Sequence, residues 1–394
     1  MTQTLFQHYL SKLKNCQDTA YSFNKDLAHH PELSGQEYQS LKNILTILSN
    51  KSISYQTNIE DVETSFLANI TKGSAQDPKI GILMEYDALP DIGHGCGHSA
   101  SGSISLLTAL AFWEMKDDLN ATIDLIGTPN EEVFGEKITM SCNGLFDSYD
   151  FVIMIHMNPK ETWASCHFLA LREIRVTYIG KPAHAAAAPW LGVNALNGAI
   201  LTTNALDMLR QQLSMDTRLA YIIKNGGIAP NVIPDKTELI INIRNKQRDD
   251  LQKTYQQVVN CIKGASLATG TTYQIEDTGP AYDDMKINKA GVEQLKLVMD
   301  ELNLPYTEEP TGVAVASSDI GNISYICPAF HPMLAISDDD ISLHTQEVAD
   351  LMKNDSINSV IFNGGRLMGA FIIRMIEHPE ILEKIKVEFS NDKN

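Results

Sequence analysis

A glycine-rich loop in the first third of the chain carries side chains that could bind a metal ion. In the segment GILMEYDALPDIGHGCGHS, residues 81–99, glycines alternate with His94, Cys96 and His98. Glycine allows the backbone to bend tightly and to approach a ligand closely. A thiolate and an imidazole two residues apart on such a loop can point toward one borderline transition-metal ion. Taken alone, the loop also fits a turn with one buried free thiol. The choice between this turn and a metal-binding loop therefore depends on the rest of the sequence.

Two further apolar runs end in possible ligands in the same way. Residues 121–127 (ATIDLIG) precede Glu131 and Glu132, and residues 150–155 (DFVIMI) directly precede His156. Each run predicts a buried strand. Strands that alternate with helices form mostly parallel sheets, and such sheets carry their functional sites at the carboxyl ends of the strands. We therefore expect the three strand ends to meet at one edge of a sheet.

The donors expected at this edge suit two metal ions with one shared ligand. They are Cys96, His98, Glu132, His156 and, from the last third of the chain, His344. The sulfur of Cys96 is a plausible bridge, and two such ions can activate a water molecule and polarise a carbonyl oxygen. Adjacent residues of an extended segment point to opposite sides, which would leave Glu131 to act as the general base. Asp87 could orient His98 through a hydrogen bond.

The remaining elements predict an α/β protein of two domains. Between residues 173 and 277 the expected order is β-α-β-β-α-β, which is the pattern of a ferredoxin-like module with its own sheet. We expect a mostly parallel catalytic domain formed by residues 1–170 and 283–394. An α+β lid domain, residues 171–282, is inserted into it.

Some local expectations concern the surroundings of the loop. The turn HHPELSGQE between two N-terminal helices carries His29, His30 and Glu37, which we interpret as solvated residues at helix ends. Ser99 or Ser101 is expected to cap the helix that follows the loop. The N-terminus of that helix would help to keep the sulfur of Cys96 ionised.

Composition excludes several classes of partner. The 394-residue chain has a net charge of −18, which argues against nucleic acid or an anionic membrane as the main partner. No apolar stretch approaches the roughly 18 residues that cross a bilayer, and the N-terminus lacks the apolar core of a signal peptide. The six cysteines are scattered without framework spacing and indicate free thiols. The expected compartment is the cytoplasm.

The motifs resemble those of a known family. EYDALPDIGHGCGHS is similar to the YDALP…GHxCGH signature of the di-metal amidohydrolases in the aminoacylase/carboxypeptidase peptidase family. Five further segments resemble later motifs of the family and occur in the same order: PNEE (129–132), IHMNP (155–159), GKPAHAAAAPWLGVNAL (180–196), GGIAPNVIPD (226–235) and LHTQEVAD (343–350). The sequences of these motifs are most similar to those of the amidohydrolase branch, which contains p-aminobenzoyl-glutamate hydrolases, IAA-amino-acid hydrolases and Xaa-Arg dipeptidases.

The resemblance implies a hydrolase that cleaves the amide bond of an N-acyl amino acid or a dipeptide and dimerises through its lid. It implies two divalent ions, zinc or manganese first and cobalt as an alternative. It assigns the five donors above as ligands, Glu131 as the base and Asp87 as the carboxylate behind the metals. His184 would reach the scissile carbonyl in the neighbouring subunit, and Asn231 and Arg244 would hold a substrate carboxylate. For Arg244, a surface arginine at a strand end is an equal alternative.

Departures from the family pattern leave other functions open. Glu85 stands where many relatives have a histidine or an aspartate, and Ser99 replaces an acid or an amide. His331 and Asp319 fit the branch pattern, with packing as an alternative role. One rival function is a metal-free cysteine hydrolase with Cys96 as the nucleophile. Another is a small-peptide-binding protein on the same scaffold that has lost catalysis.

Overall fold

The apolar run at residues 80–84 lies at the centre of the larger sheet. In the computed structural model, which describes residues 4–310 and 316–391, this run belongs to β3 (Lys79–Met84), and its last five residues are buried. The six-stranded sheet has the order β1-β2-β4-β3-β5-β11. Three strands run parallel to β3, namely β4 (Thr122–Gly127), β5 (Phe151–Ile153) and β11 (Ala329–Phe330).

The other two strands form an antiparallel edge. β1 (Tyr55–Ile59) pairs with β2 (Val62–Thr71), and β2 pairs antiparallel with β4. The predicted α/β class with a parallel centre is confirmed, and the sheet as a whole is mixed. His156 does not simply follow β5 as a loop residue. It begins β6 (His156–Asn158), which pairs with β12 (Met333–Ala335) in a separate two-stranded sheet.

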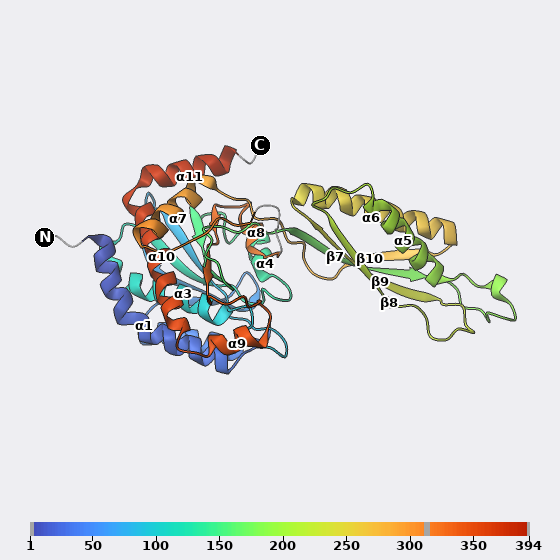
Figure 1. Cartoon of the computed structure of the whole chain (residues 1–394), viewed down its shortest axis with the longest axis horizontal. Coiled ribbons are helices and arrows are strands. Elements are labelled where there is room, and N and C mark those ends of the chain that lie inside the picture. The colour runs from blue at the N-terminus through green and yellow to red at the C-terminus, as the bar shows by residue number, and fades with distance from the viewer. Residues whose placement is uncertain (1–3, 311–315, 392–394) are drawn as a thin grey trace. The chain divides into compact units, whose positions relative to one another are not determined.

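Helices cover this sheet (Figure 1), and the helix that follows the glycine-rich loop is buried over almost its whole length. The helices are α1 (Leu5–His29), α2 (Tyr38–Asn50), α3 (His98–Trp113), α4 (Glu136–Cys142), α7 (Lys289–Glu301), α9 (Gln346–Met352), α10 (Ile357–Glu377) and α11 (Pro379–Asn391), with the short α8 (Ile320–Ile323). Every residue of α3 from His98 to Phe112 is buried. The reason is that α3 packs on β3 and is itself covered by α1 and α10.

One expectation about membrane-spanning stretches was wrong. Among the described residues, α10 is long and apolar enough to cross a bilayer by length and composition. Of its most apolar window, 56% is buried inside the protein, where α10 contacts α1 and α3. Packing of one face in the core therefore accounts for much of its hydropathy.

The inserted module has its own sheet and core. Its strands are β7 (Ala170–Ile179), β8 (Arg218–Asn225), β9 (Lys236–Asn245) and β10 (Thr272–Asp277), all antiparallel in the order β10-β7-β9-β8. Two helices, α5 (Ala195–Arg210) and α6 (Arg248–Thr269), pack on the sheet. Burial alternates along β9, which is typical of a sheet covered on one face. This arrangement confirms the predicted ferredoxin-like fold.

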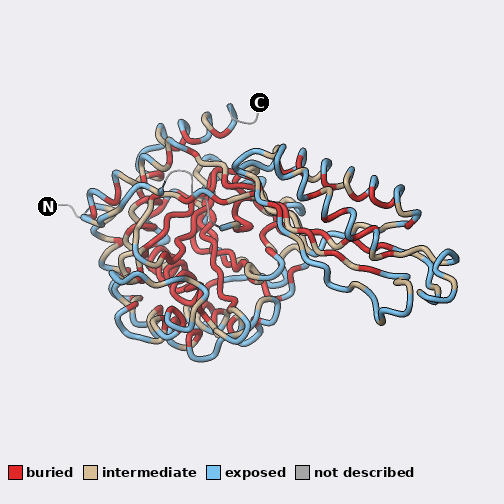
Figure 2. The backbone as a smooth tube through the Cα atoms, turned by 45° about the vertical axis from the view of Figure 1, so that its right-hand side comes forward, coloured by how far each residue is buried: buried red, intermediate tan, exposed pale blue. Residues whose placement is uncertain are grey.

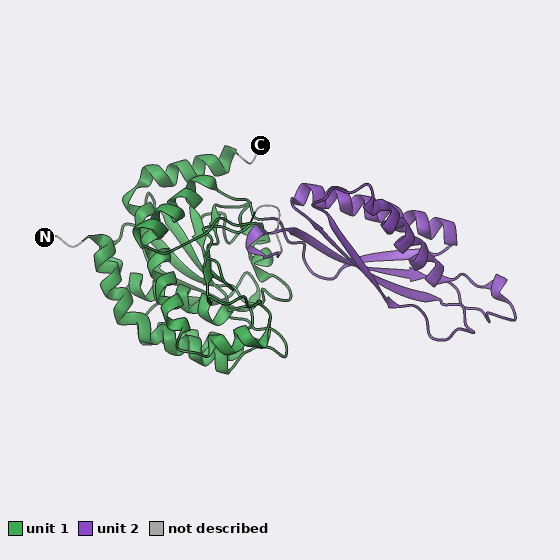
Figure 3. Cartoon of the chain, in the orientation of Figure 1, with its two compact units in different colours: residues 1–167, 285–313, 322–394 green, residues 168–284, 314–321 purple. Residues whose placement is uncertain are grey.

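The chain divides into two compact units (Figure 3). Unit 1 comprises Met1–His167, Met285–Val313 and Asn322–Asn394, and unit 2 comprises Phe168–Asp284 and Ala314–Gly321. The sequence placed the borders at 170/171 and 282/283 and did not anticipate the short second piece of unit 2. Buried backbone is concentrated in the sheet and central helix of unit 1 (Figure 2).

Candidate metal centre

The loop before α3 fixes where Cys96 and His98 point. Gly97 is the N-cap of α3 and has a φ of 88°, in the left-handed region. A Cβ at Gly97 would lie 2.6 Å from Cγ of Met157, so this position has no room for another residue. The predicted serine cap is wrong, because Ser99 and Ser101 both lie inside the helix. The hydroxyl of Ser101 instead donates to the carbonyl oxygen of Ile155 at 2.6 Å.

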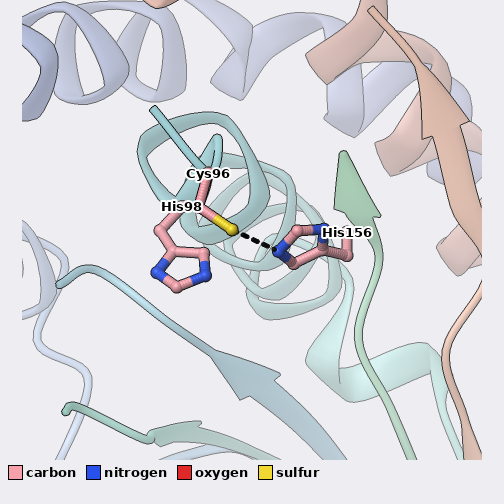
Figure 4. Close-up of side chains that lie close together, drawn as sticks. All are labelled: Cys96, His98 and His156. Atoms are coloured by element: carbon pink, nitrogen blue, oxygen red, sulfur yellow. Dashed lines mark hydrogen bonds between the residues drawn. The ribbon is translucent and has the colours of Figure 1, made fainter. Parts of the chain in front are cut away.

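Five predicted ligands from distant parts of unit 1 meet at one point (Figure 4 shows three of them). Sγ of Cys96 lies 3.5 Å from Nε2 of His156 and 3.3 Å from Nε2 of His344. The carboxylate of Glu132 lies 3.8 Å from Nε2 of His344 and 3.9 Å from Nε2 of His98. Two groups of three donors result, Cys96–His98–His156 and Cys96–Glu132–His344, and Cys96 belongs to both.

These distances fit donors that share a metal ion. Donor atoms at about 2.0–2.3 Å from one ion in a tetrahedron lie roughly 3.3–3.7 Å from each other, close to the separations observed. Nδ1 of His156 donates to the carbonyl oxygen of Met157 at 2.8 Å, which leaves Nε2 with its lone pair toward Cys96. Nε2 of His98 and Oε1 of Glu132 are buried and have no hydrogen-bond partner within the described part of the chain. The residues therefore fit the two ions that the motifs imply.

Asp87 holds two of these predicted ligands in place. Its Oδ1 accepts a hydrogen bond from Nδ1 of His98 at 3.0 Å, which turns Nε2 toward the centre. Its Oδ2 accepts from the backbone N–H of Glu132 at 3.0 Å and from the hydroxyl of Ser34 at 2.7 Å. Burial would raise the pKa of Asp87, but His98 and these hydrogen bonds outweigh it and hold the pKa well below its ordinary value.

Buried negative charge makes this centre attractive to a cation. Burial alone would lower the pKa of His98, but Asp87 and Glu85 raise it well above its ordinary value. The pKa of His156 is lowered to about 4, by burial and then by His98, so its imidazole is neutral. Burial also raises the pKa of the Cys96 thiol well above its ordinary value. In the metal-free protein, burial therefore outweighs the help that the helix terminus is expected to give a thiolate.

The pair formed by Glu85 and Lys137 was not foreseen. Nζ of Lys137 lies 2.6 Å from Oε1 of Glu85, and both side chains are at most 1% exposed. The other oxygen of Glu85 lies 3.4 Å from Nε2 of His98. Burial would raise the pKa of Glu85, but Lys137 and then His98 lower it to about 2. Lys137 lies 52 residues away in the sequence, so no local pattern points to the pair.

Two expectations about acidic residues were wrong. Glu37 is not solvated but fully buried, because its carboxylate accepts backbone and hydroxyl hydrogen bonds. Glu131 and Glu132 do not point to opposite sides: each has a carboxylate oxygen within 4.8 Å of a ring nitrogen of His98. The alternation rule fails because these residues lie in a turn that follows Asn130, whose φ is 59°.

Four histidines and one aspartate noted in the sequence take different positions in the structure. They are His331, His94, Asp319, His29 and His30. The ring of His331 stacks on that of His156 at 5.5 Å between centroids, and both are buried. His94 is buried, and burial lowers its pKa to about 3. Asp319 is buried directly before α8 and belongs to unit 2. His29 and His30 are exposed, as expected.

The predicted lid residues fall into two places within unit 2. His184 and Asn231 lie on neighbouring segments, since Val232 forms a bridge with His184 and the N–H of Ala185 donates to the carbonyl oxygen of Asn231. Arg244 lies near the other end of β9. The eight residue steps from Lys236 to Arg244 span about 26 Å at the rise of a strand. Asn231 precedes the first residue of β9, and Arg244 lies near the last.

Comparisons with known proteins agree with the fold and the motifs. Residues 170–269 match a family model described as the peptidase dimerisation domain. The Xaa-Arg dipeptidase of Mus musculus is 32% identical over 80% of this chain and 75% of its own length. The Xaa-Arg dipeptidase of Homo sapiens is also 32% identical, over 79% of this chain and 72% of its own length.

A solved structure with the same fold is the YXEP protein of Bacillus subtilis, described as a dinuclear metal-binding peptidase from the M20 family. It aligns over 92% of this chain and 99% of its own, with a TM-score of 0.67 and 17% identity. The identity and coverage of the dipeptidase relatives, the matched dimerisation domain and this shared fold all lead to one assignment. The chain belongs to the M20 family of peptidases.

Proposed function

We propose that this protein hydrolyses the amide bond of N-acyl amino acids or dipeptides with two divalent metal ions. The observation that carries the proposal is the pair of donor groups that share Cys96. One ion would be held by Cys96, His98 and His156, and the other by Cys96, Glu132 and His344. Two ions so held would lower the pKa of a bound water and polarise the substrate carbonyl. Zinc or manganese suits this mixed donor set, with cobalt as an alternative.

Glu131 is the general base of the proposed reaction. Its carboxylate lies within 4.8 Å of donor atoms of His98 and Glu132, and the residue is partly exposed, so a water molecule can reach it. Glu131 takes a proton from the attacking water and passes it to the amine nitrogen as the carbon–nitrogen bond breaks. One water is consumed, and the products are a carboxylic acid and an amine.

The test is Glu131→Gln, measured on a panel of dipeptides and N-acyl amino acids with metal content determined in parallel. The variant should bind both ions and lose roughly 10²- to 10⁴-fold in kcat. Near-normal turnover would refute the role of Glu131. A metal-loaded wild-type protein that cleaves no member of the panel would favour the rival peptide-binding protein.

Chelation separates the proposal from a metal-free cysteine hydrolase. Removal of the ions should abolish activity, and adding zinc or manganese back should restore it. The raised pKa of the buried Cys96 thiol argues against a free thiolate nucleophile in the absence of metal. Full activity in the presence of excess chelator would contradict the proposal.

The exposed face of the lid supplies a hydrogen-bond donor. Nδ1 of His184 accepts hydrogen bonds from the N–H groups of Ala186 and Ala187, so in the neutral ring the proton lies on Nε2. We assign this exposed N–H to the developing oxyanion of the substrate. Asn231 precedes β9 and Arg244 lies near the far end of the strand, and this supports a substrate carboxylate bound by Asn231 of one subunit and Arg244 of the other.

A homodimer through unit 2 would provide these two subunits. β8 is an edge strand, and Ile222 and Ile223 on it are 60% and 42% exposed. Met208 on the neighbouring helix α5 is 73% exposed. An apolar edge strand with unpaired backbone groups is suited to pairing with a second copy, and this region lies within the matched dimerisation domain. We therefore assign β8 and α5 to the dimer contact.

The proposed partners are a small substrate and a second copy of the chain, without nucleic acid or membrane. All six cysteines are free thiols. Free thiols are kept reduced in the cytoplasm, which supports the cytoplasm as the proposed compartment.

A further inference from the structure

The short segment that carries Glu131 is held on both sides by buried carboxylates. The backbone N–H of Asn130 donates to Oε1 of Glu37 at 2.9 Å, and the backbone N–H of Glu132 donates to Oδ2 of Asp87 at 3.0 Å. Asn130 has a φ of 59°, a left-handed conformation that is costly for a residue with a side chain. The turn that presents Glu131 therefore depends on support from outside it.

Glu37 joins this turn to two other parts of unit 1. Besides the N–H of Asn130, its Oε1 accepts from the N–H of Gly35 at 2.7 Å, and its Oε2 accepts from the hydroxyl of Thr64 at 2.8 Å. The residue is 0% exposed, and burial raises the pKa of its carboxyl group. Hydrogen bonds at both oxygens offset the cost of burying this group. Glu37 thus forms a rigid junction between its own turn, β2 and the turn before Glu131.

The same N-terminal segment also supports the second anchor. The hydroxyl of Ser34 donates to Oδ2 of Asp87 at 2.7 Å, the oxygen that accepts the N–H of Glu132. Leu33 forms a parallel bridge with Ala88, next to Asp87 in the sequence. Residues 33–37 therefore reach both anchors of Glu131, although about 95 residues separate them from it in the sequence.

We infer that Glu37 is a positioning residue for the base Glu131. It acts through the backbone of Asn130, and we assign it no contact with substrate or metal. The inference rests on the proposed function, since it needs Glu131 to be the base. A general base must lie within hydrogen-bond distance of the water from which it takes a proton. A displacement of about 1 Å or less therefore removes much of its catalytic effect.

The primary test is Glu37→Ala, assayed at saturating metal with the best substrate of the panel. We expect kcat to fall about 10- to 100-fold while KM stays within about threefold, because the base and not the substrate site is displaced. Glu37→Gln keeps an oxygen for both N–H donors and can donate to the oxygen of Thr64, so it should recover most of kcat. Unchanged kcat in Glu37→Ala at saturating metal would contradict the inference.

Glu32→Ala is the matched control from the same segment. The carboxylate of Glu32 accepts from the N–H of Gln39 at 2.9 Å and from the N–H and hydroxyl of Ser40 at 2.6 and 2.7 Å. These bonds lie at the start of α2, so their loss should lower thermal stability and leave kcat unchanged. An equal loss of kcat in Glu32→Ala would mean that Glu37 acts only through general stability, which would also contradict the inference.

The double variant Glu37→Ala/Glu131→Gln separates this inference from the proposed function. If Glu37 acts through Glu131, the second substitution lowers the residual rate no further, whereas independent effects would multiply. An active Glu131→Gln refutes the proposed function. If the single variant Glu131→Gln is inactive while the single variant Glu37→Ala is fully active, only the inference is refuted. If Glu37→Ala does not fold, Glu37→Asp takes its place, because it keeps the charge but draws it back from Asn130.

Discussion

The two units place their charged and apolar side chains in opposite ways. Unit 1 buries ionisable groups at the ends of its parallel strands, where Glu85, Asp87 and His98 are each 1% exposed. Unit 2 leaves large apolar groups outside, with Met208 73% and Ile222 60% exposed. Buried charge requires an opposite charge or hydrogen bonds, whereas exposed apolar surface calls for another surface to cover it. The first arrangement suits a metal centre and the second suits assembly.

The largest effect should come from breaking the buried ion pair in unit 1. Lys137→Met removes the lysine that contacts Glu85 at 2.6 Å and leaves this buried carboxylate with His98 as its cationic partner, and we expect a loss of about 3–5 kcal/mol in the free energy of unfolding. Urea unfolding followed by tryptophan fluorescence measures it. In a Trp190→Phe background the remaining tryptophans, Trp113 and Trp163, both lie in unit 1.

Two further variants sharpen this prediction. Lys353→Met removes a lysine from a partly exposed pair with Asp350 and should cost less than about 1 kcal/mol. Glu85→Gln combined with Lys137→Met removes both charges and should recover part of the loss. If the Lys137→Met protein is as stable as the Lys353→Met control, burial does not increase the contribution of the ion pair to the free energy of unfolding, and the prediction is wrong.

The second prediction concerns the apolar surface of unit 2. Ile222→Lys places a charge on the edge strand β8, and we expect dimerisation to weaken at least about 10- to 100-fold, because burial of one such side chain contributes about 1.5–3 kcal/mol. Sedimentation velocity over a range of concentrations measures the change. Leu267→Lys on α6, where Leu267 is 77% exposed, is the control and should leave the dimer intact. An unchanged dimer in Ile222→Lys would exclude β8 from the contact.

The smallest of the three effects is expected from Asp87→Asn. The amide cannot accept all the hydrogen bonds that Asp87 accepts from His98, Ser34 and Glu132, so the ligands lose their fixed orientation. We expect metal affinity to fall about 10- to 100-fold, measured by competition with a chelator of known affinity. Asp124→Asn is the control. It changes a carboxylate of β4 that is 3% exposed and bound to Asn69 and Tyr149, and it should leave metal affinity unaltered.

The sequence is sufficient to predict those parts of the structure that depend on the local pattern of apolar residues. The order β-α-β-β-α-β predicted for residues 173–277 is the order observed from β7 to β10, because each of these elements follows from its own apolar pattern. The meeting of Cys96, Glu132 and His156 follows from topology, because parallel strands bring their carboxyl ends to one edge. Their roles as ligands, and that of Glu131 as base, stay predictions until metal and activity are measured.

Long-range electrostatic partners could not be predicted in this way. Nothing near Glu37 in the sequence indicates that its oxygen accepts a hydrogen bond from the N–H of Asn130, 93 residues away, so the local pattern predicts a solvated residue. In the sequence, Glu85 stands out only as a departure from the family pattern, because its partner Lys137 lies on another element. The sequence also does not predict the orientation of Glu131, because one positive φ at Asn130 replaces an extended segment with a turn.

Unit 2 is inserted between two parts of unit 1 in the sequence, and this order has a consequence for folding during synthesis. Helix α10 packs against α1, and the hydroxyl of Tyr9 donates to the carbonyl oxygen of Gly365 at 2.8 Å, across 356 residues. The contiguous stretch Phe168–Asp284 of unit 2 leaves the ribosome before α10 exists. At about 5–20 residues per second, roughly 5–20 s pass between the end of that stretch and the end of α11. During that interval the nascent unit 1 lacks helix α10, so the surfaces of α1 and α3 that α10 covers in the folded protein stay uncovered.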